Sequence, residues 1–276
     1  MADAQPMPGD YPPADHVLRD IGLWSDPSSD PPIAGLPVQP AICGVTGACS
    51  AGALAVLLDV VAGVGALRAA EAGWVATSDL HLHWLRPVRS GDLVASTHAL
   101  RSGRTSVVLE VNVELAGEPV AYGALGFARL EARGELQTRP RAERAGRFEC
   151  GVPSSGFDRP WAQHMGVRIR DASAGVVELP VTPYVGNSLR GLQGGISVAL
   201  LDFAAEAAGT ALLGPGVATR DLAVHFVAIG RKGPLRTGVQ LLRRDGGGAL
   251  FRVESRDLGA DGLLCVLGSA RVEPFA

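Results

Sequence analysis

Two aspartates lie in the middle of apolar segments and are the residues of this sequence best suited to chemistry. Asp59 lies within 51–67 and Asp202 within 195–213, and neither has an oppositely charged neighbour in its segment. Burying an unpaired carboxylate is costly, so such a group raises its pKa or acquires a specific partner. It is a candidate site residue, although it could also accept a structural hydrogen bond or face a subunit interface. Recurrence in two similar segments favours a functional role.

A helix start precedes each aspartate by nine residues. The two starts are 193–195, with the sequence Gln-Gly-Gly, and 50–52, with the sequence Ser-Ala-Gly. Glycine lets a ligand approach the backbone closely. The free N–H groups and the positive end of a helix favour a developing oxyanion. Ordinary helix capping is the alternative, but the coupling to an aspartate at a fixed distance favours a reactive site.

The chain contains one sequence pattern twice. Asp59 and Asp202 are 143 residues apart in the numbering (202 − 59), and other segments recur at nearly the same spacing. The segments 36–40, 57–59, 75–83 and 125–129 recur at 179–183, 200–202, 217–225 and 267–271. A constant register over most of a chain is typical of an internal structural repeat.

Each copy predicts the same order of elements: a short lead segment, a strand, a glycine-rich turn, one long apolar helix, and three or four alternating strands. In the first copy the last four strands are expected at about 77–85, 92–101, 105–115 and 119–131. A helix that is apolar all round must be covered all round, so the fold class is α+β, with a curved antiparallel sheet wrapped around a central helix in each copy.

The predicted organisation has four parts. A flexible tail covers 1–15, the N-terminal copy 16–133, a polar linker 134–156 and the C-terminal copy 157–276.

The composition excludes several classes of protein. Hydrophobic residues make up 47% of the chain, which excludes a disordered protein, and the net charge of −3 argues against a nucleic-acid binder. The four cysteines show no C-x-x-C spacing, so we expect neither a zinc site nor a disulfide framework, and a reducing, cytoplasmic location. No signal peptide is expected. An aspartate at the bilayer centre costs roughly 2.5–3.5 kcal/mol, so we expect no membrane-spanning helix.

The second copy resembles the hot dog-fold acyl-CoA thioesterases, and most closely their PaaI-like and 4-hydroxybenzoyl-CoA-type branch. The residues that carry the resemblance are Asn187, Gln193, Gly194, Gly195, Leu200, Asp202, Thr219, Asp221 and Leu222. The block 87–93, followed by 102–104, is also similar to that family. The resemblance covers about 16–131 and 160–273 and implies a tandem double hot dog.

The resemblance implies that each active site is shared between the two copies. The implied site one consists of Asn187, Gln193 and Gly194 from one copy with Asp59 and Thr77 from the other. The implied site two consists of Ser50 and Ala51 with Asp202 and Thr219. Further implied substrate contacts are Gly195, Arg89 and Arg104. Gln193 stands where the family usually has His, and Gly44 stands where the second copy has Asn187. Site one is therefore the expected working site.

The expected reaction is thioester hydrolysis, in which Asp59 activates water or attacks the carbonyl itself, and the Gly194 N–H holds the oxyanion. We expect no cofactor other than the coenzyme A carried by the substrate, and a homodimer formed through edge strands. A non-catalytic acyl-thioester binding protein is the alternative. A hydratase is disfavoured because the sequence places no histidine near either helix start.

Two weaker signals remain. Asp79, His81 and His83 alternate along one strand and could hold a metal, but the second copy has Ala223 in place of His81, so no metal site is expected. Glu206 lies one helical turn after Asp202 and could pair with it, but we expect it to face solvent.

Overall fold

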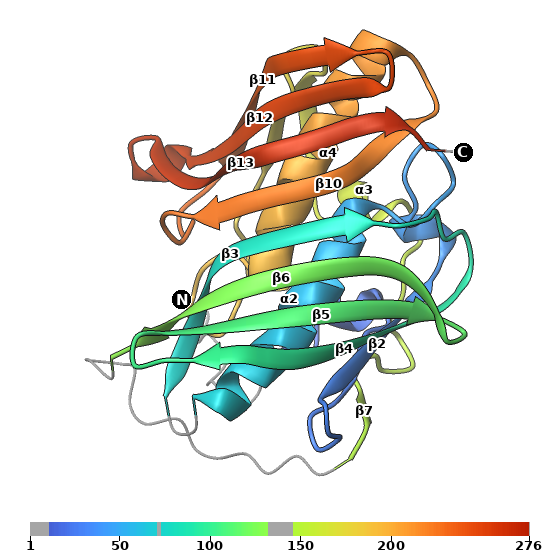
Figure 1. Cartoon of the computed structure of the whole chain (residues 1–276). Coiled ribbons are helices and arrows are strands. Elements are labelled where there is room, and N and C mark those ends of the chain that lie inside the picture. The colour runs from blue at the N-terminus through green and yellow to red at the C-terminus, as the bar shows by residue number, and fades with distance from the viewer. Residues whose placement is uncertain (1–10, 71–72, 132–145, 276) are drawn as a thin grey trace.

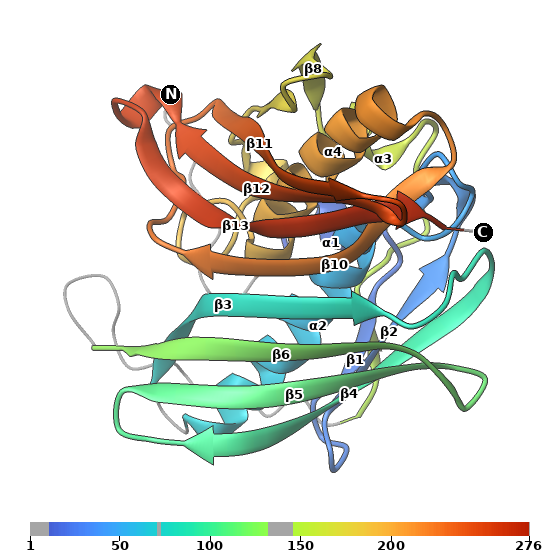
Figure 2. The same ribbon diagram turned by 45° about the horizontal axis from the view of Figure 1, so that its top comes forward.

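A single antiparallel sheet and two long helices form the body of the molecule. The computed structural model describes residues 11–70, 73–131 and 146–275. Thirteen strands make up the sheet. The helices α2 (Ala51–Ala69) and α4 (Gly194–Leu213) lie side by side on one face of it (Figure 1). Figure 2 shows both halves of the sheet bending around them.

The first half follows the predicted order, and its four long strands begin and end within three residues of the predicted bounds. Its elements are α1 (Val17–Asp20), β1 (Trp24–Asp26), β2 (Ile33–Val38), a short 3₁₀ turn η2 (Pro40–Ile42), α2, β3 (Trp74–Trp84), β4 (Gly91–Ser102), β5 (Ser106–Leu115) and β6 (Glu118–Leu130). Alternating apolar residues on these strands face α2, as in β5, where every second residue from Val107 to Val113 is buried.

The second half repeats this order. Its elements are α3 (Trp161–His164), β8 (Arg168–Asp171), β9 (Val176–Leu179), η3 (Pro183–Val185), α4, β10 (Val217–Phe226), β11 (Leu235–Asp245), β12 (Gly248–Asp257), η4 (Leu258–Ala260) and β13 (Leu263–Pro274). The lead segment of each half is a one-turn helix that ends before a glycine with positive φ, Gly22 or Gly166.

The sheet order shows how the halves meet. It reads β7-β1-β2-β4-β5-β6-β3-β10-β13-β12-β11-β9-β8. The third strand of the first half, β3, pairs antiparallel with its counterpart β10, with Asp221 opposite His83 and His225 opposite Asp79. The two copies therefore share one continuous sheet, and their helices meet behind the β3–β10 seam.

Parts of the predicted tail and linker lie outside the described residues. Of the predicted tail, 1–10 is not described, whereas Tyr11 packs against the core. Of the predicted linker, 134–145 is not described, and its remainder contains β7 (Phe148–Glu149), which pairs with β1. Arg19 donates hydrogen bonds to the carbonyls of Pro12, Pro13 and Cys150, and so holds both segments at one place.

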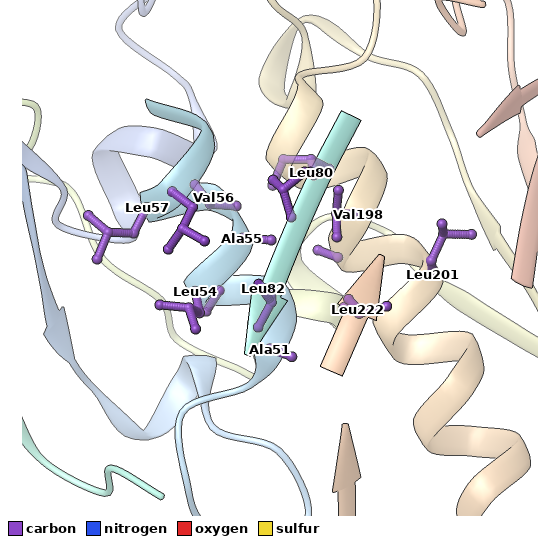
Figure 3. Close-up of a cluster of buried hydrophobic side chains, with 14 of the residues drawn as sticks. Ala51, Leu54, Ala55, Val56, Leu57, Leu80, Leu82, Val198, Leu201 and Leu222 are labelled. Carbon is purple, nitrogen blue, oxygen red and sulfur yellow. The ribbon is translucent and has the colours of Figure 1, made fainter. Parts of the chain in front are cut away.

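The two long helices are apolar enough to cross a membrane by length and composition, but here they form the protein core. Within their most apolar windows, 72% of the residues of α2 and 61% of those of α4 are buried in the fold. Leu80 and Leu82 of β3 and Leu222 of β10 lie beside side chains of both helices, among them Val56 and Val198 (Figure 3). All five side chains are fully buried. The core helix of an α+β sheet accounts for this composition.

The helices approach most closely at a glycine. A Cβ on Gly195 would lie 2.5 Å from the Cα of Val56, so the first turn of α4 rests directly on the backbone of α2. In the pseudosymmetric contact, a Cβ on Gly52 would lie 2.8 Å from the Cα of Ala199. Backbone atoms cannot move aside as a flexible side chain can, so this crossing requires glycine at both positions.

We predict that Gly195→Ala and Gly63→Ala change stability in opposite directions. In Gly195→Ala the new methyl group overlaps the α2 backbone, which should lower the free energy of unfolding by about 1–3 kcal/mol. At Gly63 no described atom lies within 4 Å of an added Cβ. Its replacement should raise stability by about 0.5–1 kcal/mol through helix propensity. Urea unfolding of both variants tests this, and equal effects would contradict the close approach.

Candidate active site

Three donors from both halves hold the Asp59 carboxylate. The Thr77 hydroxyl, at the start of β3, donates to Oδ1 at 2.7 Å. The Gln193 side-chain amide donates to Oδ2 at 2.7 Å, and the Gly195 N–H donates to the same oxygen at 3.1 Å. Asp59 and Thr77 belong to the first half and the other two residues to the second. The structure thus brings together, at the junction of the copies, four of the residues singled out in the sequence. We call this arrangement site one.

Gln193 has two tasks at the start of α4. It is the N-cap residue, and its Oε1 accepts from the Ile196 N–H at 2.8 Å while its Nε2 reaches Asp59. An amide side chain can accept and donate at once, which a hydroxyl cap on a shorter side chain cannot do over this span. The corresponding Ser50 caps α2 by accepting from the Ala53 N–H at 3.2 Å. Helix capping and carboxylate orientation are therefore combined only in site one.

Burial raises the pKa of Asp59, and the hydrogen bonds from Thr77 and Gly195 oppose this rise. The residue is buried, with 9% of it exposed, whereas its counterpart Asp202 has no exposed surface. A carboxylate with a raised pKa is a stronger base than an ordinary aspartate. The positive end of α4 beside it also favours negative charge at this place.

Gly194 presents a free donor next to Asp59. It is the first residue of α4, and among the described residues its N–H has no hydrogen-bond acceptor. A Cβ at this position would lie 2.8 Å from both oxygens of Asp59, so only glycine fits against the carboxylate. Gly194 is partly exposed, whereas its counterpart Ala51 is buried. The Gly195 N–H thus binds the Asp59 carboxylate, and the Gly194 N–H remains free to donate.

Asp202 lies in the related arrangement of the second half, which we call site two. The Gly52 N–H donates to its Oδ2 at 2.7 Å. Asp202 is fully buried, and burial raises its pKa to about 6. Three buried oxygens here lack a well-formed hydrogen bond within the described part of the chain: Asp202 Oδ1, Glu206 Oε1 and Thr219 Oγ1. The Thr219 hydroxyl nevertheless lies close enough to Asp202 to oppose the rise of its pKa, as Thr77 does at Asp59. Site two has the same backbone donor as site one but encloses unsatisfied polar atoms.

Glu206 is buried rather than facing solvent, which corrects the expectation from the sequence. Only 9% of it is exposed, and burial and the charge of Asp202 raise its pKa well above the usual range. A Cβ on Gly44 would lie 3.2 Å from both Glu206 carboxylate oxygens, so the side chain fills the space between α4 and the loop before α2. The counterpart of Glu206 is Gly63, where an added Cβ would meet no described atom within 4 Å, so α2 places no second carboxyl group one turn after Asp59.

The other implied site residues are less directly placed. The Asn187 amide bonds within its own loop, donating to the Leu192 carbonyl at 3.0 Å and accepting from the Gly191 N–H at 3.0 Å. Arg89 is exposed and follows Val88, whose carbonyl accepts from the Cys49 N–H, so it lies near site two.

Arg104 is exposed in the β4–β5 turn, next to Ser102, whose hydroxyl donates to the Ala69 carbonyl at the end of α2. This end of the helix is about 15 Å along its axis from Asp59. Arg231 is the counterpart of Arg89 in the second half. Its guanidinium donates to the Leu189 carbonyl, in the loop that leads to Gln193 of site one.

Sequence reasoning missed two residues beside site one. His16 donates from Nε2 to the Gly186 carbonyl at 2.8 Å, although the sequence indicated no histidine near a helix start. Its Nδ1 accepts from the Leu18 N–H, and burial lowers the pKa of His16, so the ring is neutral. The Tyr11 hydroxyl bonds to the same carbonyl at 3.4 Å, and burial together with the charge of Asp59 raises its pKa. His16 is the N-cap residue of α1, and Pro160 occupies the matching position before α3, so the comparison of the two copies did not point to a histidine here.

The potential metal ligands do not converge. Across the described residues, no three His, Cys, Asp or Glu side chains are placed to hold a metal ion. Of the alternating residues Asp79, His81 and His83, His83 instead bonds through Nδ1 to Asp221 Oδ1 at 2.6 Å, across the β3–β10 seam. Its ring also stacks near Tyr122 on the outer face of the sheet.

Comparison with known proteins identifies the fold of this chain. The thioesterase superfamily model matches residues 46–121, which include Asp59 and Thr77. No curated protein gives a significant match. A conserved protein of unknown function with a hot dog fold, from Alicyclobacillus acidocaldarius, is 17% identical and covers 95% of this chain and 98% of its own, with a TM-score of 0.62. The chain has the hot dog fold.

Two further solved structures align over nearly the same length. The tesB protein of Mycobacterium avium subsp. paratuberculosis is 16% identical and covers 87% of this chain and 92% of its own, with a TM-score of 0.56. An acyl-ACP thioesterase from Bacteroides thetaiotaomicron VPI-5482 is 12% identical and covers 87% of this chain and 97% of its own, with a TM-score of 0.57. At these identities the similarity establishes the hot dog fold alone.

We predict that Glu206→Gln stabilises the protein as the pH rises. Because the folded state raises the Glu206 pKa, the stability that this group contributes is complete below its unfolded pKa of about 4.3. It is lost progressively as the pH rises from there through the folded pKa. The variant should match the wild type near pH 4 and exceed it by roughly 1–3 kcal/mol at about pH 8 in urea unfolding.

Glu178→Gln is the matched control. Glu178 is also largely buried, but hydrogen bonds from Arg236 and Arg170 lower its pKa. Its stabilisation is therefore present above the unfolded pKa and lost as the pH falls. Replacement should weaken the fold at about pH 8, the opposite sign to Glu206→Gln. The same sign for both variants would contradict an unpaired carboxyl group at Glu206.

Proposed function

We propose that this chain is a tandem double hot dog that hydrolyses acyl thioesters, with acyl-CoA as the substrate, at site one. The observation that carries the proposal is the Asp59 carboxylate, held by donors from both halves at the start of α4 beside the partly exposed Gly194. A base and a free N–H donor side by side are the two groups that acyl transfer to water requires. The match of 46–121 to the thioesterase superfamily supports the same reaction class.

Hydrogen bonding leaves Asp59 one position for substrate water. Two carboxylate oxygens offer about four acceptor positions. Oδ2 accepts from Gln193 and Gly195, and Oδ1 accepts from Thr77, so one position on Oδ1 stays free. A water bound there gives its proton to Asp59 as its oxygen attacks the thioester carbonyl. The same geometry suits direct attack by Oδ1, which forms an acyl anhydride with Asp59 as the C–S bond breaks; water then hydrolyses the anhydride, which releases the acid and restores the carboxylate. In both routes the leaving thiolate takes up a proton.

The Gly194 N–H is proposed to stabilise the oxyanion. It lies at the positive end of α4 beside the carboxylate, and it is free to donate to a carbonyl oxygen. One such donor is worth about 3 kcal/mol in the transition state. Gln193 and Thr77 act as positioning residues, because they fix the carboxylate that must face this carbonyl.

The contrast between the two sites explains why site one is proposed to work. In site two, Asp202 is fully buried, the Ala51 methyl group replaces the Gly194 hydrogen, and Glu206 fills the space that Gly63 leaves unfilled. For the coenzyme A phosphates we propose Arg231 and Lys232, which are exposed beside the loop that leads to Gln193.

We predict that Asp59→Asn and Asp202→Asn separate the two sites. Asparagine keeps the size of the side chain but cannot accept a proton as a base, so Asp59→Asn should lower kcat by about 10²–10⁴-fold. Asp202→Asn should leave kcat nearly unchanged. The measurement is hydrolysis of short-, medium- and long-chain acyl-CoA and of an acyl-ACP, with thiol release as the readout. Full activity in Asp59→Asn would contradict site one, and tight binding without turnover by the wild type would indicate an acyl-thioester binding protein.

We predict that Gly194→Ala lowers kcat more than it lowers stability. The added methyl group would overlap both Asp59 oxygens and displace the carboxylate from its donors. We expect a loss of about 100-fold or more in kcat. Ala51→Gly, the reciprocal change in site two, serves as the control and should leave site one unaffected. Unchanged kcat in Gly194→Ala would contradict the requirement that the Asp59 carboxylate stay packed against Gly194.

A further inference from the structure

Two free cysteines face each other across a β-bridge in the loop before α2. Cys43 and Cys49 are paired antiparallel, and the hydrogen bonds lie on either side of the pair. The Gly44 N–H donates to the Ala48 carbonyl at 2.9 Å, and the Ser50 N–H donates to the Ile42 carbonyl at 3.1 Å. This pattern defines a non-hydrogen-bonded pair, in which the Cα atoms are about 4.5 Å apart and the side chains lie on the same side.

A disulfide needs the spacing that this pair provides. Disulfide-bonded cysteines have Cα atoms roughly 4.4–6.8 Å apart, and directly opposed antiparallel residues fall in that range. The two thiols make only weak contacts at present: Cys43 Sγ with the Gln39 carbonyl at 3.5 Å, and Cys49 Sγ with the Ser50 carbonyl at 3.8 Å. We propose that Cys43 and Cys49 form a reversible intramolecular disulfide on exposure to a small hydroperoxide.

The position of the pair ties it to site two. Gly44, the residue after Cys43, lies against the Glu206 carboxylate, and the Cys49 thiol is close enough to Asp202 for that charge to raise its pKa in addition to burial. The loop that the disulfide would fasten is thus the loop over the two buried carboxyl groups. The equivalent bridge in the second half joins Gly186 and Leu192, so the loop of site one has no thiol at these positions.

The two cysteines differ in access, which assigns their roles. Cys43 is half-buried and Cys49 is 3% exposed, so the oxidant meets Cys43 first. The Cys43 thiolate attacks one peroxide oxygen, the O–O bond breaks, and sulfenic acid and water form after one proton is taken up. Cys49 then attacks the Cys43 sulfur, the S–O bond breaks, and the hydroxyl leaves as water with the Cys49 proton. Two thiols and one hydrogen peroxide give one disulfide and two waters.

Burial sets the rate of this reaction. It raises the pKa of both thiols, so little thiolate is present at neutral pH and oxidation by hydrogen peroxide should be slow. Once formed, the bond closes a short loop from Cys43 to Cys49 and restricts the unfolded chain. The oxidised protein should therefore unfold at a temperature a few degrees higher than the reduced protein.

Peptide mass spectrometry of the full chain tests the proposal. Both cysteines lie in one tryptic peptide, residues 20–68, because this stretch has no internal arginine or lysine before Arg68. After treatment with hydrogen peroxide, denaturation and blocking with N-ethylmaleimide, this peptide should be lighter by two hydrogens and carry no maleimide. Dithiothreitol should restore two maleimide adducts. Cys150 and Cys265 are internal controls and should stay alkylated.

The single variants Cys43→Ser and Cys49→Ser separate the disulfide from general oxidation. Neither variant can form the bond, so neither should show the rise in unfolding temperature on treatment with peroxide. The proposal is overturned if both wild-type cysteines still take up maleimide after treatment. It is also overturned if Cys43 is converted to sulfinic acid without a disulfide, or if the bond forms to Cys150, to Cys265 or between two chains.

Discussion

A carboxylate in the middle of an apolar helix can be kept only if donors reach it from elsewhere, and the crossing of α2 and α4 supplies them. The first turn of α4 rests on the α2 backbone at Gly195, where no side chain separates the two helices. This contact brings the N–H groups of α4 to Asp59. The same contact therefore packs the two helices together and provides hydrogen bonds to the carboxylate. Without this close crossing, the buried charge of Asp59 would have no partner on the other half.

The chain builds this crossing twice and uses it in two ways. Asp59 and Asp202 each accept one backbone N–H from the opposite helix. Around Asp59 a glutamine and a threonine complete the set, and a glycine leaves space beside it. Around Asp202 an alanine methyl group and Glu206 take up the space, and polar oxygens stay unsatisfied. The backbone geometry is the same at both crossings, and side chains at a few facing positions make the surroundings of Asp59 and Asp202 different.

Residues that differ between the two copies near the helix starts add a second level of difference. Tyr11 and His16 fasten the N-terminal segment to the Gly186 carbonyl, directly before the loop of site one. The corresponding loop of site two carries the facing pair Cys43 and Cys49 instead. Both features lie in or against the loop that leads into a long helix. At this point of the fold, site one therefore has a tyrosine and a histidine bound to the loop, and site two has two facing thiols within it.

The sequence by itself determined the elements and the register of the two copies. In the strands, apolar and polar residues alternate because every second side chain faces the core, and the two long helices are apolar on all sides because they are covered on all sides. The spacing of Asp59 and Asp202 from their helix starts can likewise be read directly from the order of residues. The resemblance to a known family also implied the grouping of Asp59 with Gln193 and Thr77. Only the tertiary structure decided that Gly195, rather than Gly194, donates to the carboxylate, that Asn187 bonds to its own loop, and that Glu206 is buried. It also decided that His16 lies beside site one and that Cys43 faces Cys49. These outcomes depend on loop conformation and on contacts between distant segments, which leave no periodic signal in the order of residues.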